Sequence, residues 1–421
     1  MAIDKKVLKS SIEREQNELA RSAEREKIKG LKNLNVPPLR FPEFQGKWEK
    51  KRISEFCTLL KGTGISKDQL STNGKPCILY GELYTKYKAE IINEVLSCTE
   101  LDANTLVKSK VNDVIIPCSG ETAIDIATAR CIPFDDVLLG GDLNILRSNK
   151  VNGSFLAYQL NGKRKYDIAR VAQGVSVVHL YGEHLNNIVI SLPVIEEQQK
   201  ISRLLHLLDE RIATQNKIIE DLKKLKSAII EMEYGQMAKS ISHIGDFIEQ
   251  ISKRNKDSAI KNVLSVSNSQ GFIQQSEQFE NRIVASDDTS NYKIVKRNDF
   301  AFNPARINVG SIARLTTFER GIVSPMYICF RTKDILLPEY LDYYFKSKQF
   351  STEIQKRLEG SVRQCLSFDG LCNIPLSVPA IEIQQQIGKR LSALVQEINL
   401  EIDFLELLQK QKKFLLYQMF I

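Results

Sequence analysis

A duplication within the chain constrains its fold more than any other feature of the sequence. Residues 185–201 read LNNIVISLPVIEEQQKI, and residues 371–387, shifted by 186 positions without a gap, read LCNIPLSVPAIEIQQQI. The identical positions include Ile188, Ser191, Pro193, Ile195, Glu196, Gln198, Gln199 and Ile201. Because self-similarity at a fixed offset marks a repeated structural unit, we expect the chain to fold as two copies of one unit.

The same offset reaches backwards into segments that are otherwise divergent. Offsets that differ from 186 by one to five residues align further segments, and all the matched segments occur in the same order in both copies. The matches are Asn112-Asp113 with Asn298-Asp299, Gly174 with Gly360, Leu156–Tyr158 with Leu341–Tyr343, and Ile53–Phe56 with Ile244–Phe247. Each copy is therefore predicted to be a globular part followed by a helix.

Apolar residues recur at alternating spacings of four and three in both predicted helices. They are Ile201, Leu205, Leu208, Ile212, Ile219, Leu222 and Ile229 in the first copy, and Ile387, Leu391, Leu394, Ile398, Leu405, Leu408 and Leu415 in the second. Heptad spacing sustained this long predicts a coiled coil. The polar breaks also coincide, Gln215 with Glu401 and Lys226 with Lys412. They are either register markers or solvated ends of the seam.

We expect the two helices to pair, with the segments around Leu205 and Leu391 in contact. A helix from Glu196 to Tyr234 would be roughly 58 Å long. The segments between the helices contain short β-rich runs separated by polar, Gly-containing turns, as in residues 113–117 and 321–330. The predicted fold class is α+β, with two similar mixed domains separated by the long helices.

Composition adds only weak constraints. The net charge of +8 suits a polyanionic partner. The eight cysteines form no Cys-x-x-Cys and the four histidines no paired ligand set, which predicts no metal site and reduced thiols in a cytosolic core. The charged N-terminus lacks a signal-peptide core, and no apolar run is long enough to span a bilayer. We therefore expect a cytoplasmic protein.

Motifs for catalysis are not found. Asn303-Pro-Ala-Arg306 lacks the second proline and the aromatic residue of an adenine-methylation motif, and Gly62–Lys67 lacks phosphate-loop spacing. Asp221-Leu-Lys223 lies on the predicted helix without an upstream acidic partner, and His179 and His184 have no accompanying nucleophile elbow. The sequence therefore gives no support to an enzyme.

Several segments resemble those of Type I restriction-modification specificity subunits, in order and doubled. They are residues 36–48 (VPPLRFPEFQGKW) leading into 53–56, the two helix entries at 192–201 and 378–387, and, inside the domains, 79–84, 119–122, 173–179, 302–311 and 360–363. Two features depart from the family: Ile383 stands where the first copy has Glu197, and an additional charged helix is predicted over residues 3–33. Its apolar residues are sparse: Val7, Leu8, Ile12, Leu19, Ile28 and Leu31.

The resemblance implies a division into five parts. These are an N-terminal charged helix (1–34), a first target-recognition domain (35–194), a first spacer helix (195–240), a second target-recognition domain (241–380) and a second spacer helix (381–421). Each domain would read one half of an asymmetric, interrupted site in double-stranded DNA. The helices would pair antiparallel, so that the two copies imitate a two-fold dimer, and would act as spacer and dock for two methyltransferase (M) subunits, which restriction (R) subunits would join. Methylation with S-adenosylmethionine and ATP-driven cleavage would belong to those partners, leaving this chain without a cofactor.

Polar side chains on loops are the candidates for DNA contact, because forked donors and acceptors read base edges. In the first domain they are Lys61, Thr63, Ser66, Ser119, Glu121, Thr122 and Ser176, with Lys163, Arg164 and Lys165 assigned to phosphates. In the second they are Arg306, Asn308, Arg314, Arg363 and Gln364. The helices around Leu205, Ile212, Ile219, Leu391, Ile398 and Leu405 are expected to dock the M subunits.

Two other functions are compatible with parts of the sequence. A stand-alone nuclease would require a metal-binding carboxylate cluster, which is not apparent. A coiled-coil scaffold without a DNA role explains the helices but not two diverged globular units. Cleavage of DNA by the chain alone with magnesium would favour the first, and a complex that does not bind DNA would favour the second.

Overall fold

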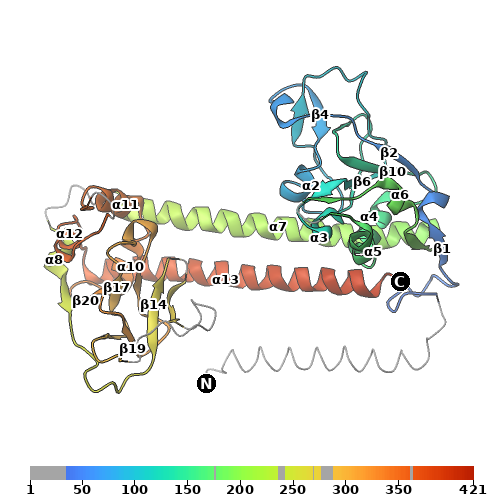
Figure 1. Cartoon of the computed structure of the whole chain (residues 1–421). Helices are drawn as coiled ribbons and strands as arrows, with labels where there is room; N and C mark the ends of the chain where they lie inside the picture. The colour runs from blue at the N-terminus through green and yellow to red at the C-terminus, as the bar shows by residue number, and fades with distance from the viewer. Residues whose placement is uncertain (1–34, 175–176, 236–241, 269, 276–287, 361–363) are drawn as a thin grey trace. The chain divides into compact units, whose positions relative to one another are not determined.

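The computed structural model describes residues 35–174, 177–235, 242–268, 270–275, 288–360 and 364–421 (Figure 1). The chain forms two compact units: the first ends at Gln215 and also includes Phe404–Ile421, and the second is Asn216–Asp403. Each of the two long helices, α7 (Ile195–Tyr234) and α13 (Ile381–Gln418), therefore contributes one half to each unit.

The first unit contains two four-stranded sheets. One is antiparallel in the order β2-β10-β6-β8, formed by Thr58–Lys61, Leu143–Arg147, Asp113–Pro117 and Arg130–Ile132. The other has the order β3-β5-β4-β9, formed by Leu70–Ser71, Ser97–Thr99, Lys75–Ile78 and Leu138–Leu139, with β4 and β9 parallel. Two strand pairs complete it: β1 (Glu49–Arg52) with β12 (Val189–Leu192), and β7 (Ser119–Gly120) with β11 (Val178–His179).

Short helices connect these strands. They are η1 (Ile53–Glu55), η2 (Lys67–Gln69), α2 (Glu82–Thr85), α3 (Ala123–Ile126), α4 (Gly153–Asn161), α5 (Lys165–Val171) and α6 (Gly182–Asn186). The main core lies between the first sheet, α4 and the long helices, and includes Trp48, Phe155, Leu205 and Phe420.

The second unit repeats the first sheet, whereas its second sheet keeps the parallel pair but has an additional strand beyond it. Its first sheet has the order β13-β20-β17-β18, formed by Ile248–Ile251, Ile328–Thr332, Phe300–Phe302 and Ile312–Arg314. Its second has the order β15-β14-β19-β16, formed by Gly271–Gln274, Val263–Ser267, Arg320–Val323 and Lys293–Lys296, with β14 and β19 parallel. The helices are α8 (Ile244–Phe247), η4 (Ile307–Val309), α10 (Pro338–Tyr344), α11 (Lys348–Gln355) and α12 (Phe368–Cys372).

Equivalent backbone hydrogen bonds confirm the duplication at the predicted offset. The Ile53 amide donates to the Ile188 carbonyl, and the Ile244 amide donates to that of Ile374. A bridge between Gln173 and His179 has its counterpart between Glu359 and Cys365. Left-handed backbone conformations also recur, at Asn112 (φ 80°) and Asn298 (φ 73°), and at Gly174 (φ 120°) and Gly360 (φ 104°). The mixed, doubled fold predicted from the sequence is therefore confirmed.

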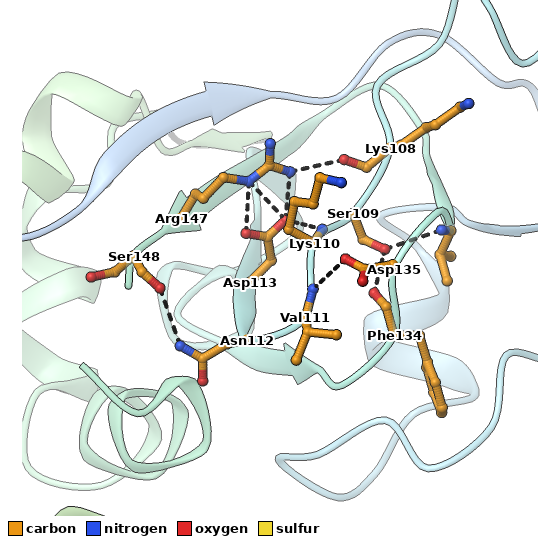
Figure 2. A network of polar contacts seen from close by, with 11 residues as sticks. Lys108, Ser109, Lys110, Val111, Asn112, Asp113, Phe134, Asp135, Arg147 and Ser148 are labelled. Carbon is orange, nitrogen blue, oxygen red and sulfur yellow. Dashed lines mark hydrogen bonds and ion pairs between the residues drawn. The ribbon is translucent and has the colours of Figure 1, made fainter. Parts of the chain in front are cut away.

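The matched Asn-Asp pairs mark a polar network that is built in both copies. In the first, Asp113 is 1% exposed, accepts a hydrogen bond from the Lys110 amide and forms a bidentate ion pair with Arg147 (Figure 2). In the second, Asp299 accepts from the Lys296 amide and pairs with Arg331. A buried carboxylate needs such partners, because an unpaired charge in the core is costly.

A glutamine common to both copies joins each helix to its own domain. The Gln198 side chain accepts a hydrogen bond from the Asn152 amide at 2.9 Å and donates to the Pro193 carbonyl at 2.8 Å. Gln384 bonds in the same way to the Leu337 amide and the Pro379 carbonyl, both at 2.8 Å. The identical glutamines of the repeat therefore fix how each helix leaves its globular part.

The difference between Glu197 and Ile383 also has a structural reason. Glu197 is buried, and its carboxylate receives both the Nε and Nη2 groups of Arg40 at 2.7 Å and the indole N–H of Trp48 at 3.3 Å. Both donors come from the 36–48 segment that precedes the first copy. Ile383 is 48% exposed at the equivalent place. The acidic residue therefore stands where that segment crosses the helix entry.

The long helices run antiparallel within each unit. In the first, Leu205 of α7 packs in one core with Leu415 and Met419 of α13; in the second, Ile230 of α7 packs with Leu391 of α13. Antiparallel pairing is confirmed. The expectation that the segments around Leu205 and Leu391 contact each other is wrong, because in an antiparallel pair each meets the opposite end of its partner helix.

Lys412, one of the polar seam residues, lies in a buried charge cluster of the first unit. Its ammonium contacts the carboxylates of Glu90 and Asp209, and Asp209 accepts a hydrogen bond of 2.7 Å from the Tyr158 hydroxyl. Burial would lower the pKa of Lys412, but the two carboxylates outweigh it and raise the pKa. The alternative of a solvated seam end is therefore wrong for this position.

We expect Lys412→Met to destabilise the protein by about 3–5 kcal/mol, because it leaves two buried carboxylates without their cation. The matched control is Lys410→Met on the same helix. The Lys410 ammonium is exposed, and its ion pair with Glu406 is long, at 3.9 Å. Denaturant unfolding of both variants measures the difference. Equal stability of the two would contradict a structural role for the cluster.

The cluster also predicts a pH dependence. Lys412 has a raised pKa, so its contribution is present below its unfolded pKa of about 10.4 and is lost as the pH rises through the folded value. Glu90 has its pKa lowered by Lys412 against the effect of burial, so its contribution is lost as the pH falls below about 4.3. The stability difference between wild type and Lys412→Met, measured against pH, is therefore expected to be greatest between these limits.

Candidate DNA interface

Three segments that are far apart in the sequence meet at the β7–β11 pair of the first unit. Strand pairing places Ser119 opposite His179, and the Ser119 hydroxyl lies 3.3 Å from Nδ1 of His179. The Tyr84 hydroxyl donates to the Ser119 carbonyl at 2.9 Å. We call these three side chains, together with Lys61 at the end of β2, the β7–β11 edge. It presents hydroxyl and imidazole groups, which can donate to or accept from base edges.

Lys61 lies at the same edge. It ends β2, is exposed, and its charge acts on Cys118, the residue before β7. Burial raises the pKa of the Cys118 thiol to about 11, against the lowering effect of Lys61. The ammonium is thus placed beside the β7–β11 edge, where it can contact a phosphate.

Other first-domain candidates have local structural partners. The Thr63 hydroxyl accepts from the Val107 amide at 3.0 Å, and the Thr122 hydroxyl caps α3 by accepting from the Asp125 amide at 3.1 Å. Ser66 and Glu121 are exposed, and Ser66 precedes η2. Thr122 and Glu121 directly follow β7, whereas the Ser66 amide donates to the Gln69 side chain at the start of η2.

The basic run Lys163–Lys165 lies instead against the C-terminal end of α13. The Lys163 ammonium lies 3.8 Å from the ring centre of Tyr417, and Arg164 donates to the terminal Ile421 oxygen at 2.9 Å. Lys165 has its pKa lowered by burial and by Arg130. Lys163 and Arg164 thus contact the end of α13 within the first unit, and Lys165 is partly buried; the sequence predicted phosphate contacts for all three.

The corresponding place in the second unit holds Arg306. The Leu366 amide donates to the Pro304 carbonyl, as the Leu180 amide donates to that of Cys118, so residues 304–306 match 118–120. Arg306 is exposed and, with Ser267, Asn268, Val309 and Ser311, lines a shallow polar pocket. Asn308 and Gln364 are also exposed near these segments, in η4 and just before the Glu359–Cys365 bridge closes.

Arg314 does not belong to this group. It ends β18 opposite Phe300, its Nε is buried, and its charge acts on the Tyr343 hydroxyl that bonds to Ser392 of α13. Strand pairing matches Arg314 with Cys131, and the neighbouring Arg130 is buried in β8, where it donates to the Tyr87 and Ala129 carbonyls. The structure thus places Arg314 near Tyr343 of α10.

The remaining predicted residues lie either outside the described residues or in the seam between the long helices. Ser176 and Arg363, like the predicted N-terminal helix, lie outside the described residues. Of the residues that mark M-subunit docking, Leu205, Ile219, Leu391 and Ile398 are buried in the helix seam, and Ile212 and Leu405 are partly buried. A partner that docks on these helices would therefore contact neighbouring positions.

Tyr84, His179, Ser267 and Asn268 contribute to these surfaces but were not among the predicted contacts. Tyr84 and His179 stood in segments that already resembled the family, so that signal could have found them. Ser267 and Asn268 have no sequence signal, since only the fold brings the end of β14 beside Arg306.

In the described part of the chain, the His, Cys, Asp and Glu side chains form no group of three or more that could hold a metal ion. None of its helices is long and apolar enough to cross a membrane.

Comparison with known proteins agrees with the duplicated fold. The family model of the Type I restriction modification DNA specificity domain matches residues 45–224 and again 240–409. Two relatives from Methanocaldococcus jannaschii are similar: the Type I restriction enzyme MjaVIII specificity subunit, 23% identical over 89% of this chain and 92% of that protein, and the putative MjaX specificity subunit, 24% identical over 66% and 70%.

Two solved structures share the fold. The S subunit of a Type I restriction-modification system from M. genitalium has a TM-score of 0.58 and 15% identity, covering 92% of this chain and 99% of its own. A chain from a study of assembly and conformational transition of the type I R-M system has a TM-score of 0.54 and 15% identity, covering 90% and 98%. With two family domains spanning most of its length, the chain belongs to the Type I restriction-modification specificity subunits, the family that recognises DNA sequence.

Proposed function

We propose that each unit reads one half of an asymmetric, bipartite site in double-stranded DNA. One observation carries this: the same backbone frame presents different side chains in the two copies. Where the first has Ser119, Gly120 and His179, the second has Ala305, Arg306 and Cys365. Because base readout depends on donor and acceptor pattern, edges that differ in this way favour different half-sites.

The residues proposed to contact DNA fall into two groups. Ser119, His179, Arg306, Asn308 and Gln364 have the chemistry for base edges, and an arginine can bind guanine through two hydrogen bonds. Lys61 suits a phosphate, where an ammonium acts as a point charge. Glu121, Thr122, Ser66, Thr63, Ser176 and Arg363 stay predictions. Lys163, Arg164, Lys165 and Arg314 also stay predictions, although Lys163 and Arg164 have contacts at the end of α13 and the Nε of Arg314 is buried.

The catalytic steps of the system are proposed to lie in partner subunits. Each unit has the same helix entry, held by Gln198 or Gln384, so two M subunits could dock in equivalent ways on the two helix halves. R subunits would join that core in the cytoplasm. This chain would then need no cofactor, and methylation of adenine in each half-site would report what it reads.

Mapping methylated adenines in the host genome tests this proposal directly. We expect one motif made of two unlike half-sites separated by a fixed number of unread base pairs, and we expect it to disappear when this gene is deleted. A continuous or palindromic motif would contradict the assignment of one half-site to each unit.

Arg306→Ala is expected to weaken binding of the assembled complex to its site by about 1–3 kcal/mol and to relax one base position of the second half-site. The matched control is Arg320→Ala, which removes an exposed arginine from β19 of the same unit. Competition binding against a set of single-base variants measures both. Unchanged discrimination by Arg306→Ala would remove this residue from the interface.

A further inference from the structure

The shallow polar pocket of the second unit has two walls that come from different parts of the chain. One wall is the turn that follows β17, with Arg306 and Val309, and the other is the end of β14, with Ser267. The buried Ser311 also lines the pocket, and its hydroxyl donates to the Val266 carbonyl at 3.3 Å. This hydrogen bond joins the two walls at the floor of the pocket.

Gly310 lets the two walls approach each other closely. Its φ is 89°, a left-handed conformation that favours glycine, and a Cβ at this place would lie 3.7 Å from the Cβ of Asn268. On the inner side, the turn is anchored by Ile307, which is buried in the core of the second unit. With Ile307 pointing inward, the exposed side chains of Arg306 and Val309 line the pocket.

Arg306 brings a positive charge that no acid in the pocket offsets. Of the described residues that line the pocket, it alone carries a charge. Two other exposed arginines of this unit have carboxylate partners, Arg297 with Glu319 at 2.7 Å and Arg331 with Asp299 at 3.1 Å. Arg306 is therefore well suited to bind the O6 and N7 acceptors of a guanine in the major groove.

Val309 adds an apolar group to the rim of this polar pocket. It is 55% exposed and thus belongs to no hydrophobic core. Because a β-branched side chain has few χ1 rotamers, fixing it against a ligand costs little conformational entropy. In the major groove, the 5-methyl group of thymine is the apolar group among donors and acceptors. An exposed valine beside a guanine-binding arginine therefore matches a thymine methyl group.

The turn also limits how far apart the two contacted bases can lie. The Val309 amide donates to the Arg306 carbonyl at 3.2 Å, so the two residues belong to one turn of the 3-10 helix η4. Side chains three residues apart in such a turn lie on the same side, with a rise of about 6 Å between them. Successive bases are about 3.4 Å apart along the duplex, so the two contacts fall within two base-pair steps.

We propose that Val309 is a specificity-determining residue that contacts the 5-methyl group of a thymine in the second half-site. This thymine lies within two base pairs of a guanine bound by Arg306. The proposal rests on the proposed function of the second unit, and it adds the identity of two of the bases that this unit reads.

Replacing thymine by deoxyuridine tests the proposal, because it removes the methyl group and keeps every hydrogen-bonding group of the base. Each thymine of the second half-site, on both strands, is replaced in turn in duplexes that carry the mapped motif. Competition binding by the complex assembled with its M subunits is expected to show a loss of about fourfold at one position, as for one buried methyl group. That position is expected within two base pairs of the base that Arg306→Ala relaxes.

Val309→Ser is expected to bind the thymine and deoxyuridine duplexes equally well at that position, because the apolar contact is absent from both complexes. Val309→Ile keeps a branched apolar side chain and is expected to keep the preference for thymine. The matched control is Ile335→Ser, which alters another exposed apolar residue of the second unit and should retain the full fourfold difference.

The possible failures are distinguishable. Equal binding of all the deoxyuridine duplexes by the wild type, with preference for the motif over unrelated DNA intact, would overturn the methyl contact and leave DNA reading by the second unit in place. A fourfold loss that persists in Val309→Ser, with an unchanged thermal unfolding midpoint, would assign the methyl group to another residue. Binding of the motif no tighter than unrelated DNA would overturn the proposed function together with this inference.

Discussion

The first unit of the protein is completed by a helix half that is remote from it in the sequence, and the rest of that unit depends on this pairing. The first unit is formed mainly by residues before Gln215, yet Met419 and Phe420 lie buried in its core. The Phe420 ring lies 5.2 Å from that of Phe155 in α4. Because burying an aromatic side chain is worth several kcal/mol, the first globular part cannot reach its full stability before the end of the chain is in place.

The pairing is built from apolar seams that are nearly the same in both units, but its polar contacts differ. Lys412 faces Asp209 and Glu90 in the first unit, whereas the sequence equivalents of Lys412 and Asp209 are Lys226 and Val395. Lys226 is half-buried, and burial together with Lys346 lowers its pKa. Lys412 contacts two carboxylates, whereas its equivalent Lys226 lies near another lysine. The polar contacts of the helix pair therefore differ between the two units. We infer that this asymmetry favours the observed register over alternatives with equivalent apolar contacts.

In the globular parts, the residues that hold the fold are distinct from the residues proposed to determine specificity. Residues that hold the frame were retained in both copies: the Asp113 and Asp299 ion pairs, and the two glutamines at the helix entries. Side chains on the exposed edge changed, as between Gly120 and Arg306. A duplicated fold can therefore present two unlike surfaces while its first sheet keeps the same strand pairing.

The sequence by itself determined the duplication, its offset, the long helices and the family, because identical residues and heptad spacing are written directly in the chain. It also located the segments that form the β7–β11 edge, through their resemblance to known domains. Tertiary structure alone decided which contacts the basic residues make within the chain: Lys163 and Arg164 lie against the end of α13, and the Nε of Arg314 is buried. It likewise decided that Lys412 is buried in a charge cluster, since Glu90 is 322 residues away and no local pattern links the two.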